Sequence, residues 1–214
     1  MIINIKRSRR KSVAIKVTEK GELFVLCPLK FSNKEINKLI QQKQTWINKA
    51  IQKVQQKYLD QQDYYNYKKI MFLGKSYNIN IDENFIKIGD NAIKYKKGSN
   101  IKNFLKQWLI KQANAVILQR LDNISDAIKT NYKSAKIISA RKKWGSCDNL
   151  NNINLNFRLV MLPLDCIDYV CIHELCHIKH MNHSKLFWNE VEKYTNHKEI
   201  NKVVKEFSFV LELF

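Results

Sequence analysis

The sequence has few acidic residues and no long apolar run. Among its 214 residues, 38 are Lys or Arg and only 19 are Asp or Glu. No apolar stretch is long enough to span a bilayer, and the basic N-terminal residues lack the apolar segment of a secretory signal. Internal repeats and low-complexity linkers are absent from the sequence as well. We therefore expect a globular, cytoplasmic protein that has no membrane partner.

The cysteines do not suggest a disulfide framework. Their number is odd and no two form a Cys-x-x-Cys pair, which favours reduced, mostly buried thiols. The five are Cys27, Cys147, Cys166, Cys171 and Cys176. Cys147 is the only one that we also consider as a thiol near the candidate site, and a packed small side chain is the favoured interpretation.

The net charge of +19 is unevenly distributed. Residues 1–97 have 21 Lys and Arg against eight Asp and Glu, a net charge of +13, and residues 98–214 have a net charge of +6. Such a charge favours nucleic acid or nucleotides as partners. The excess of Lys over Arg favours a simple role in solubility instead, because Arg is preferred for bidentate phosphate contacts. The oligomeric state is not encoded in these patterns.

The first 97 residues indicate a β-hairpin and helix region. Strands at 12–17 and 22–26 flank a turn signal at 19–21, and a basic cluster at 6–11 precedes them. Ser32 is a predicted N-cap for an amphipathic helix over 34–57. A second hairpin is predicted around Gly74, followed by short strands at 84–88 and 92–95. The lone Gly74-Lys75-Ser76 lacks the earlier glycine of a phosphate-binding loop.

The remaining residues, 98–214, are predicted to form a second domain. Gly98 and Ser99 mark the boundary, and a long amphipathic helix is expected over 100–128. A strand at 136–143 and a turn at 144–146 follow. Asn152 to Leu159 alternates apolar and polar residues, which predicts a strand with one buried face.

A His-Glu-x-x-His motif, His173 to His177, lies in a mostly apolar predicted helix over 165–178 that Asp165 caps. On a helix, residues four apart lie about 40° apart around the axis, so the two imidazoles can bind one metal ion. Glu174 projects beside the ion, where it can take a proton from an activated water. The alternative is a pair of structural histidines that are merely hydrogen-bonded.

A catalytic zinc site needs a third protein ligand and one open position. His183 is favoured, because Asn182 tolerates the left-handed turn that brings the chain back after the helix. His180, at about 10 Å along a straight helix from His173, is too distant to bind the same ion easily. Glu190 and Glu192 remain alternatives. Ser184 is expected to cap the next helix.

The sequence resembles a known family in the run RKKWGSC…INLNFRLVMLP…IDYVCIHELCHIKHMNHSKLFW. It is similar to the YgjP-like metal-dependent hydrolases, which are classed as zinc metallopeptidases and are distantly related to the SprT-like and WLM proteases. The similarity is dense over 137–194 and extends to the N-terminal SRRKSVAIKVTEKGELFVLCP and FLGKSYNI. Met181 replaces a common Pro and Cys176 a common Ala, and neither is an implied ligand.

The resemblance implies an α+β fold with a zincin-like core, in which the helix bearing the motif lies beside a small β-sheet. It also implies Zn²⁺ as the cofactor. The implied metal ligands are His173, His177 and His183, and the implied catalytic residue is Glu174. The strand before the helix borders the active site in this family, so its polar side chains are candidates for substrate binding. They are Asn154, Asn156 and Arg158.

The expected function is that of a zinc-dependent hydrolase, a metallopeptidase that acts on peptides or proteins. Two alternatives remain. A metal-dependent phosphohydrolase acting on nucleotides would use the same activated water, and the positive charge would favour its substrate. A basic nucleic-acid-associated protein with structural zinc would need a fourth protein ligand, such as Cys147 or His180.

Overall fold

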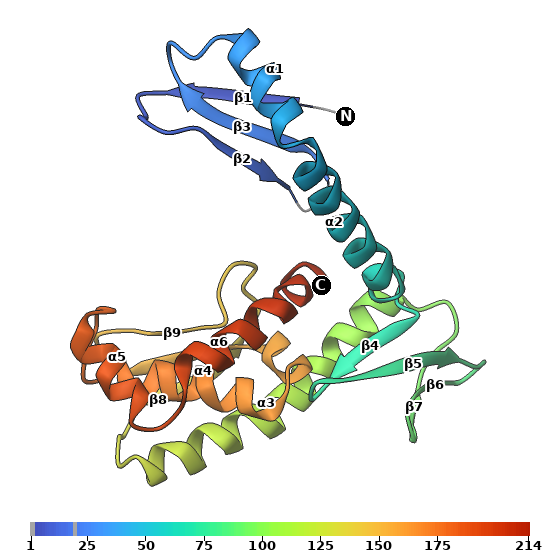
Figure 1. The fold of residues 1–214 in the computed structure, drawn as a ribbon. Helices are drawn as coiled ribbons and strands as arrows, with labels where there is room; N and C mark the ends of the chain where they lie inside the picture. The colour runs from blue at the N-terminus through green and yellow to red at the C-terminus, as the bar shows by residue number, and fades with distance from the viewer. Residues whose placement is uncertain (1–2, 19–20) are drawn as a thin grey trace. The chain divides into compact units, whose positions relative to one another are not determined.

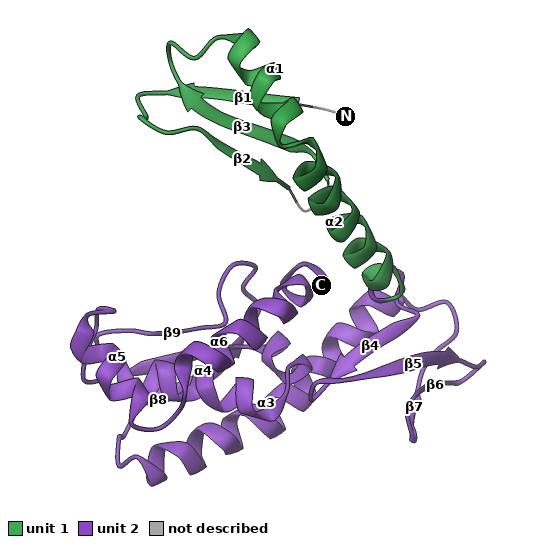
Figure 2. Cartoon of the chain, viewed as in Figure 1, with its two compact units in different colours: residues 1–63 green, residues 64–214 purple. Residues whose placement is uncertain are grey.

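The computed structural model describes residues 3–18 and 21–214, which form two compact units, residues 1–63 and 64–214 (Figure 2). The fold is of the predicted α+β type. The boundary between the units in the sequence lies after residue 63, whereas the predicted boundary lies after residue 97. The strands between residues 69 and 94 belong to the second unit, where their side chains join its hydrophobic core.

Unit 1 contains a three-stranded sheet, in which β3 lies between the other two strands (Figure 1). Its strands are β1 (Ile3–Ser8), β2 (Ala14–Val17) and β3 (Leu23–Pro28). The antiparallel pair of β2 and β3 confirms the predicted hairpin. Glu19 and Lys20 of the expected turn lie outside the described residues. The parallel pairing of β1 with β3 was not predicted, and it includes Lys6 and Arg7 of the basic cluster.

Helix α1 (Asn33–Gln42) packs on this sheet, and α2 (Gln44–Tyr65) adds Ile47 and Ile51 near its N-terminal end. The single helix predicted over 34–57 is therefore interrupted, and the interruption is at Lys43. The predicted cap at Ser32 is confirmed, because its hydroxyl accepts from the Glu35 N–H while the Glu35 carboxylate accepts from the Ser32 N–H. The buried core between the sheet and the helices consists of Leu23, Val25, Cys27, Ile36, Ile40 and Ile47.

Unit 2 begins with a four-stranded antiparallel meander. Its strands are β4 (Lys69–Phe72), β5 (Lys75–Ile81), β6 (Phe85–Ile88) and β7 (Asn91–Lys94). Leu73 and Gly74 form the first turn with positive φ angles of 48° and 77°. The Leu73 N–H donates to the Val160 carbonyl at 2.8 Å, so this turn is held against the segment before the motif helix. Gly74-Lys75-Ser76 is thus part of a hairpin rather than of a phosphate-binding loop.

The second sheet of unit 2 has the order β8-β10-β9. Its strands are β8 (Ser134–Ile138), β9 (Gly145–Cys147) and β10 (Asn152–Asn156), with β9 antiparallel and β8 parallel to β10. The helices of the unit are α3 (Ile101–Ala127), α4 (Leu164–Cys176), α5 (Lys185–Glu192) and α6 (His197–Glu206). Two 3-10 helices complete it, η1 (Phe157–Met161) and η2 (Phe207–Glu212).

Four local predictions in this region were wrong. The strand predicted over 136–143 is β8, which begins at Ser134 and ends at Ile138. Residues 145–147 form an edge strand instead of a turn. The strand predicted to Leu159 ends at Asn156, because the Asn156 side chain accepts from the Arg158 N–H and starts η1. The motif helix begins at Leu164, so Asp165 lies in its first turn and does not cap it.

Helix α4 lies at the centre of unit 2, where it packs against α3, β9 and β10. The motif helix therefore lies beside a small β-sheet, as predicted. Most of its residues are buried, from Cys166 to Cys176, with Asp168 and His173 only half-buried. Within the described residues, no helix is both long enough and apolar enough to cross a membrane.

Candidate metal centre

Three histidines converge at the C-terminal end of α4. His173 lies in the last turn of α4, His177 directly follows the helix, and His183 lies in the segment that leads to α5. Their ligand nitrogens all lie within 4.8 Å of one another, and the Nε2 atoms of His173 and His183 are 3.0 Å apart. Nitrogens bound tetrahedrally to one zinc ion are about 3.3 Å apart, so the three side chains fit such an ion.

Burial favours the neutral form of His173 and His177, which is the form that binds a metal ion. Burial lowers the pKa of His173 to about 3, and the neighbouring histidines add to this effect. Burial also lowers the pKa of His177. The Nδ1 atom of His177 lies 3.1 Å from the His180 carbonyl, and an N–H there leaves the Nε2 lone pair free for a metal.

Aromatic rings hold these imidazoles from the side of α5. The Phe187 ring stacks on His177 with centroids 4.5 Å apart, and the Trp188 ring stacks on His183 at 5.6 Å. The Trp188 ring also stacks on His197, with ring centroids 4.6 Å apart. The Nδ1 atom of His197 pairs with the Glu192 carboxylate. His183 is exposed, so this stack restrains a ligand that solvent would otherwise leave mobile.

Glu174 points toward the edge strand β9. A Cβ built on Gly145 would lie 2.6 Å from Oε1 and 2.8 Å from Cγ of Glu174, so the carboxylate occupies the space that any larger side chain would take. Burial raises the pKa of Glu174 to about 7, while Lys143 and a hydrogen bond from the Cys147 main chain oppose that shift. The side chain of Glu174 is thus a buried carboxyl group that lies against Gly145 of the edge strand β9.

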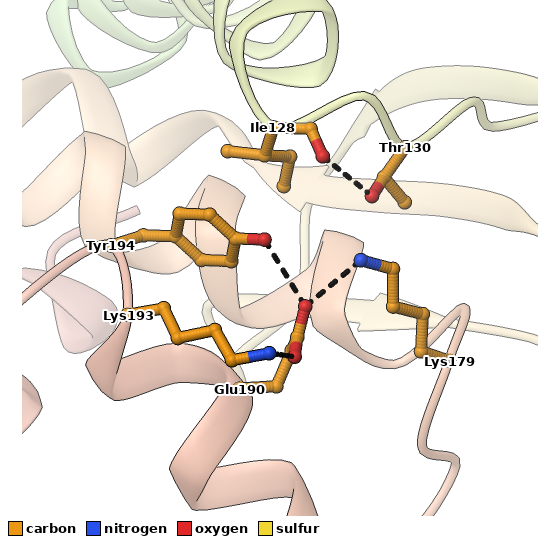
Figure 3. A network of polar contacts seen from close by, with 6 residues as sticks. All are labelled: Ile128, Thr130, Lys179, Glu190, Lys193 and Tyr194. Carbon is orange, nitrogen blue, oxygen red and sulfur yellow. Dashed lines mark hydrogen bonds and ion pairs between the residues drawn. The ribbon is translucent and has the colours of Figure 1, made fainter.

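The other residues considered as ligands have different partners. Glu190 accepts from Lys179, Lys193 and Tyr194 at 2.8, 2.5 and 3.1 Å, as Figure 3 shows. These lysines lower the pKa of Glu190 to about 2. Glu192 pairs with His197.

The two candidates for a fourth ligand also lie outside the cluster. His180 contributes its carbonyl, not its ring, to His177. Cys147 is a protonated thiol, because burial and the carboxylates of Glu174 and Asp148 raise its pKa to about 11. In the described part of the chain, the cluster contains the three histidines alone.

The structure does not bring the three candidate substrate-binding side chains to the histidines. Asn154 is paired with Ser146, on the face of the sheet opposite to the one where Gly145 meets Glu174. The buried Asn156 amide donates to the Ala140 and Lys143 carbonyls. Arg158 is fully buried, where its guanidinium donates to the carbonyls of Ala140 and Phe214.

Sequence reasoning missed two features of the centre. Gly145 was assigned to a turn, although a glycine is also typical of a close approach between the main chain and another group. The stack of Trp188 on His183 was not predicted either. Trp188 lies five residues after His183, but only the cap at Ser184 and the following turn of α5 bring the rings together.

A family model described as YgjP-like, metallopeptidase domain, matches residues 11–206. The chain belongs to the YgjP-like family. The match spans most of both compact units, and it identifies the YgjP-like chain as a metal-dependent hydrolase of the metallopeptidase class. No curated protein matches the sequence.

Two solved structures are similar to parts of this YgjP-like chain. The metallopeptidase zymogen abylysin of Pyrococcus abyssi is 22% identical, with a TM-score of 0.40 over 45% of this chain and 96% of abylysin. The metallopeptidase zymogen jannalysin of Methanocaldococcus jannaschii is 24% identical, with a TM-score of 0.38 over 46% of this chain and 97% of jannalysin.

Proposed function

We propose that the protein is a zinc-dependent peptidase in which His173, His177 and His183 hold the metal and Glu174 is the general base. The observation that supports this most is the contact between Glu174 and Gly145. The carboxylate follows His173 of the histidine cluster directly in the chain and lies against β9, which is an edge strand of its sheet. The whole of residues 64–214, rather than 98–214 alone, is then the hydrolase domain.

The reaction follows from these positions. When bound, zinc supplies Lewis acidity, which lowers the pKa of a nearby water to about 7 and polarises the carbonyl under attack. Glu174 accepts the proton of the attacking water and passes it to the leaving amine. His177 keeps its Nδ1 proton on the His180 carbonyl, which fixes the orientation of the ring.

The strand β9 provides the substrate-binding surface. It pairs with β10 on one side only, so its outer main-chain groups, apart from the Cys147 group that bonds to Glu174, are available to a peptide that adds as a further strand. Such a peptide would lie over the Gly145–Glu174 contact. Main-chain pairing replaces Asn154, Asn156 and Arg158 as the proposed means of binding the substrate.

The peptide substrate is favoured over the alternatives. The tripeptide Gly74-Lys75-Ser76 does not form a phosphate-binding loop, because Gly74 lies in a hairpin turn and Lys75 begins the strand β5. The histidine cluster has three members, whereas a closed structural zinc site needs four ligands.

The test is metal content together with turnover of an unfolded protein and of nucleoside triphosphates. We expect one zinc per chain and cleavage of the protein substrate only. Glu174→Gln is expected to keep the zinc and to lose at least about 100-fold in turnover. Glu206→Gln, which changes an exposed carboxylate of α6, is the matched control.

His183→Ala tests the third ligand and is expected to lose zinc. Full zinc occupancy in that variant would mean that another residue completes the site. Normal turnover in Glu174→Gln would remove the proposed base, and hydrolysis of triphosphates without proteolysis would establish the phosphohydrolase instead.

A further inference from the structure

Unit 1 has an apolar groove on its surface, beside the sheet. It is lined by Val13, Ile15, Leu39, Lys43 and Trp46 and has a volume of about 320 Å³. This volume is at the lower end of the range of about 300–1,000 Å³ that is typical of ligand pockets. Val13 and Ile15 also pack against the buried core of unit 1, so the floor of the groove is fixed. Trp46, by contrast, is 50% exposed.

The groove runs along an edge of the sheet. Ile15 belongs to β2, which pairs with β3 on one side and is the outer strand of the sheet (Figure 1). Alternate residues of such a strand direct their N–H and C=O groups outward, where an added strand can pair with them. An extended peptide that pairs with β2 would therefore place side chains in the groove.

The charge of unit 1 selects the kind of peptide. Residues 1–63 contain 14 Lys and Arg against five Asp and Glu, a net charge of +9, whereas residues 64–214 have +10 over more than twice the length. Lys43 lines the groove itself, and Lys16 is exposed on β2. The nearest acidic residue of α1, Glu35, is engaged at the helix N-terminus by Ser32. An acidic chain is thus attracted and a basic chain repelled.

We propose that this groove docks an acidic, extended segment of the polypeptide substrate, which pairs with β2 and seats one large apolar side chain against Trp46. The identity of the occupant as substrate rests on the proposed peptidase function, whereas the docking itself does not. Because unit 1 is covalently joined to the hydrolase unit, docking raises the local concentration of the substrate at the active site.

The binding test uses the full chain carrying Glu174→Gln, so that the probe stays intact, as mass spectrometry would verify. The probe is a fluorescein-labelled ten-residue peptide in which Asp or Glu alternates with Val or Leu, and binding is measured by anisotropy. Trp46→Ala and Lys43→Glu are each expected to weaken binding about tenfold. The matched controls, Leu59→Ala and Lys53→Glu, alter α2 outside the groove and are expected to change binding less than twofold.

Two modified peptides test the mode of binding without changing the protein. N-methylation at every residue removes the main-chain donors on both edges of the peptide and is expected to abolish binding. Replacement of the acidic residues by Lys is expected to do the same. Equal binding of the Lys peptide, or of the probe to Trp46→Ala, would overturn the proposal.

Other occupants give distinct results. Tighter binding of a single-stranded oligonucleotide, with displacement of the peptide and loss in Trp46→Ala, would assign the groove to nucleic acid. A dimer in sedimentation that Trp46→Ala dissociates would assign it to a second copy of the chain. Either result would overturn the proposal.

Kinetics separate docking from catalysis. In the otherwise wild-type chain, Trp46→Ala is expected to raise the KM for an unfolded acidic protein about tenfold and to keep kcat. An unchanged KM would show that the docked peptide is not a substrate. Failure of the peptidase proposal would appear as a wild-type chain that does not cleave the unfolded protein, a result that leaves the binding measurements intact.

Discussion

Gly145 lies against the carboxylate of Glu174, with no space between them for a methyl group. The two residues come from different elements, the edge strand β9 and the motif helix α4. The absence of a side chain at position 145 therefore lets the main chain of β9 approach the proposed base directly.

Gly145→Ala tests this contact. The added Cβ would come within 2.8 Å of Glu174 Cγ, so the carboxylate must move, and we expect cleavage to fall at least about tenfold while metal affinity stays within about twofold. A double-mutant cycle with Glu174→Asp is the control, because the shorter carboxylate relieves the crowding. Additive effects in that cycle would place the cause elsewhere.

The stack of Trp188 on His183 makes a second prediction. Loss of the Trp188 ring leaves an exposed ligand without its restraint, so Trp188→Ala is expected to weaken zinc binding about tenfold in competition with a chelator. Trp188→Phe keeps an aromatic surface and is expected to restore most of the affinity. Leu186→Ala, which alters an exposed residue of the same helix, is the control. Unchanged affinity in Trp188→Ala would remove its positioning role.

Glu190 predicts a dependence of stability on pH. Its pKa in the folded chain is lowered from 4.5 to about 2, so its contribution is fully present above pH 4.5 and is lost as the pH falls toward 2. Since Lys179 and Lys193 are partly exposed, we expect Glu190→Gln to cost on the order of 2 kcal/mol at pH 6.

Urea titrations at pH 6, 4 and 3, in excess chelator, would measure this difference between the wild type and Glu190→Gln. The difference in the free energy of unfolding is expected to shrink with each step to lower pH. A difference that is constant between pH 6 and pH 3 would mean that the ion pairs do not stabilise the fold.

Arg158 is predicted to act in stability rather than in substrate binding. Its guanidinium is buried over the Phe157 ring and donates to the carbonyls of Ala140 and Phe214. Arg158→Ala removes the buried donor to the Phe214 carbonyl and one of the two donors to the Ala140 carbonyl, so the free energy of unfolding is expected to fall by about 2–4 kcal/mol. Arg141→Ala, at an exposed neighbour, is expected to change it by less than about 0.5 kcal/mol. A large rise in KM for the stable fraction of Arg158→Ala would restore a role in binding.

Local signals in the sequence were sufficient for most of the helices. Ser32 and Ser184 cap α1 and α5, as side-chain chemistry at helix N-termini predicts, and α3 follows the predicted helix over 100–128. The spacing of the motif likewise predicted that His173 and His177 would project together, and His183 was placed with them by the turn that follows. These features depend on residues that are close in the sequence.

The features that were missed depend on distant residues. Residues 145–147 have the composition of a turn, and they form a strand because β10 pairs with them. The alternation of apolar and polar residues continues through Phe157 and Arg158 in the sequence. Arg158 is nevertheless buried, because carbonyls from two remote segments accept hydrogen bonds from its guanidinium. The parallel partner of β1 is β3, and β2 lies between these two strands in the sequence.

The histidine cluster and the surface that would bind a substrate differ in how the chain builds them. His173 and His183 are ten residues apart, so a single helix and the turn after it assemble the ligands with little loss of chain entropy. The edge strand reaches Glu174 only when the sheet has formed. A variant with a loosened sheet can therefore retain its metal and lack a working active site. For this protein, a full complement of metal reports on the folding of α4 and the following turn, and the integrity of β9 has to be measured separately.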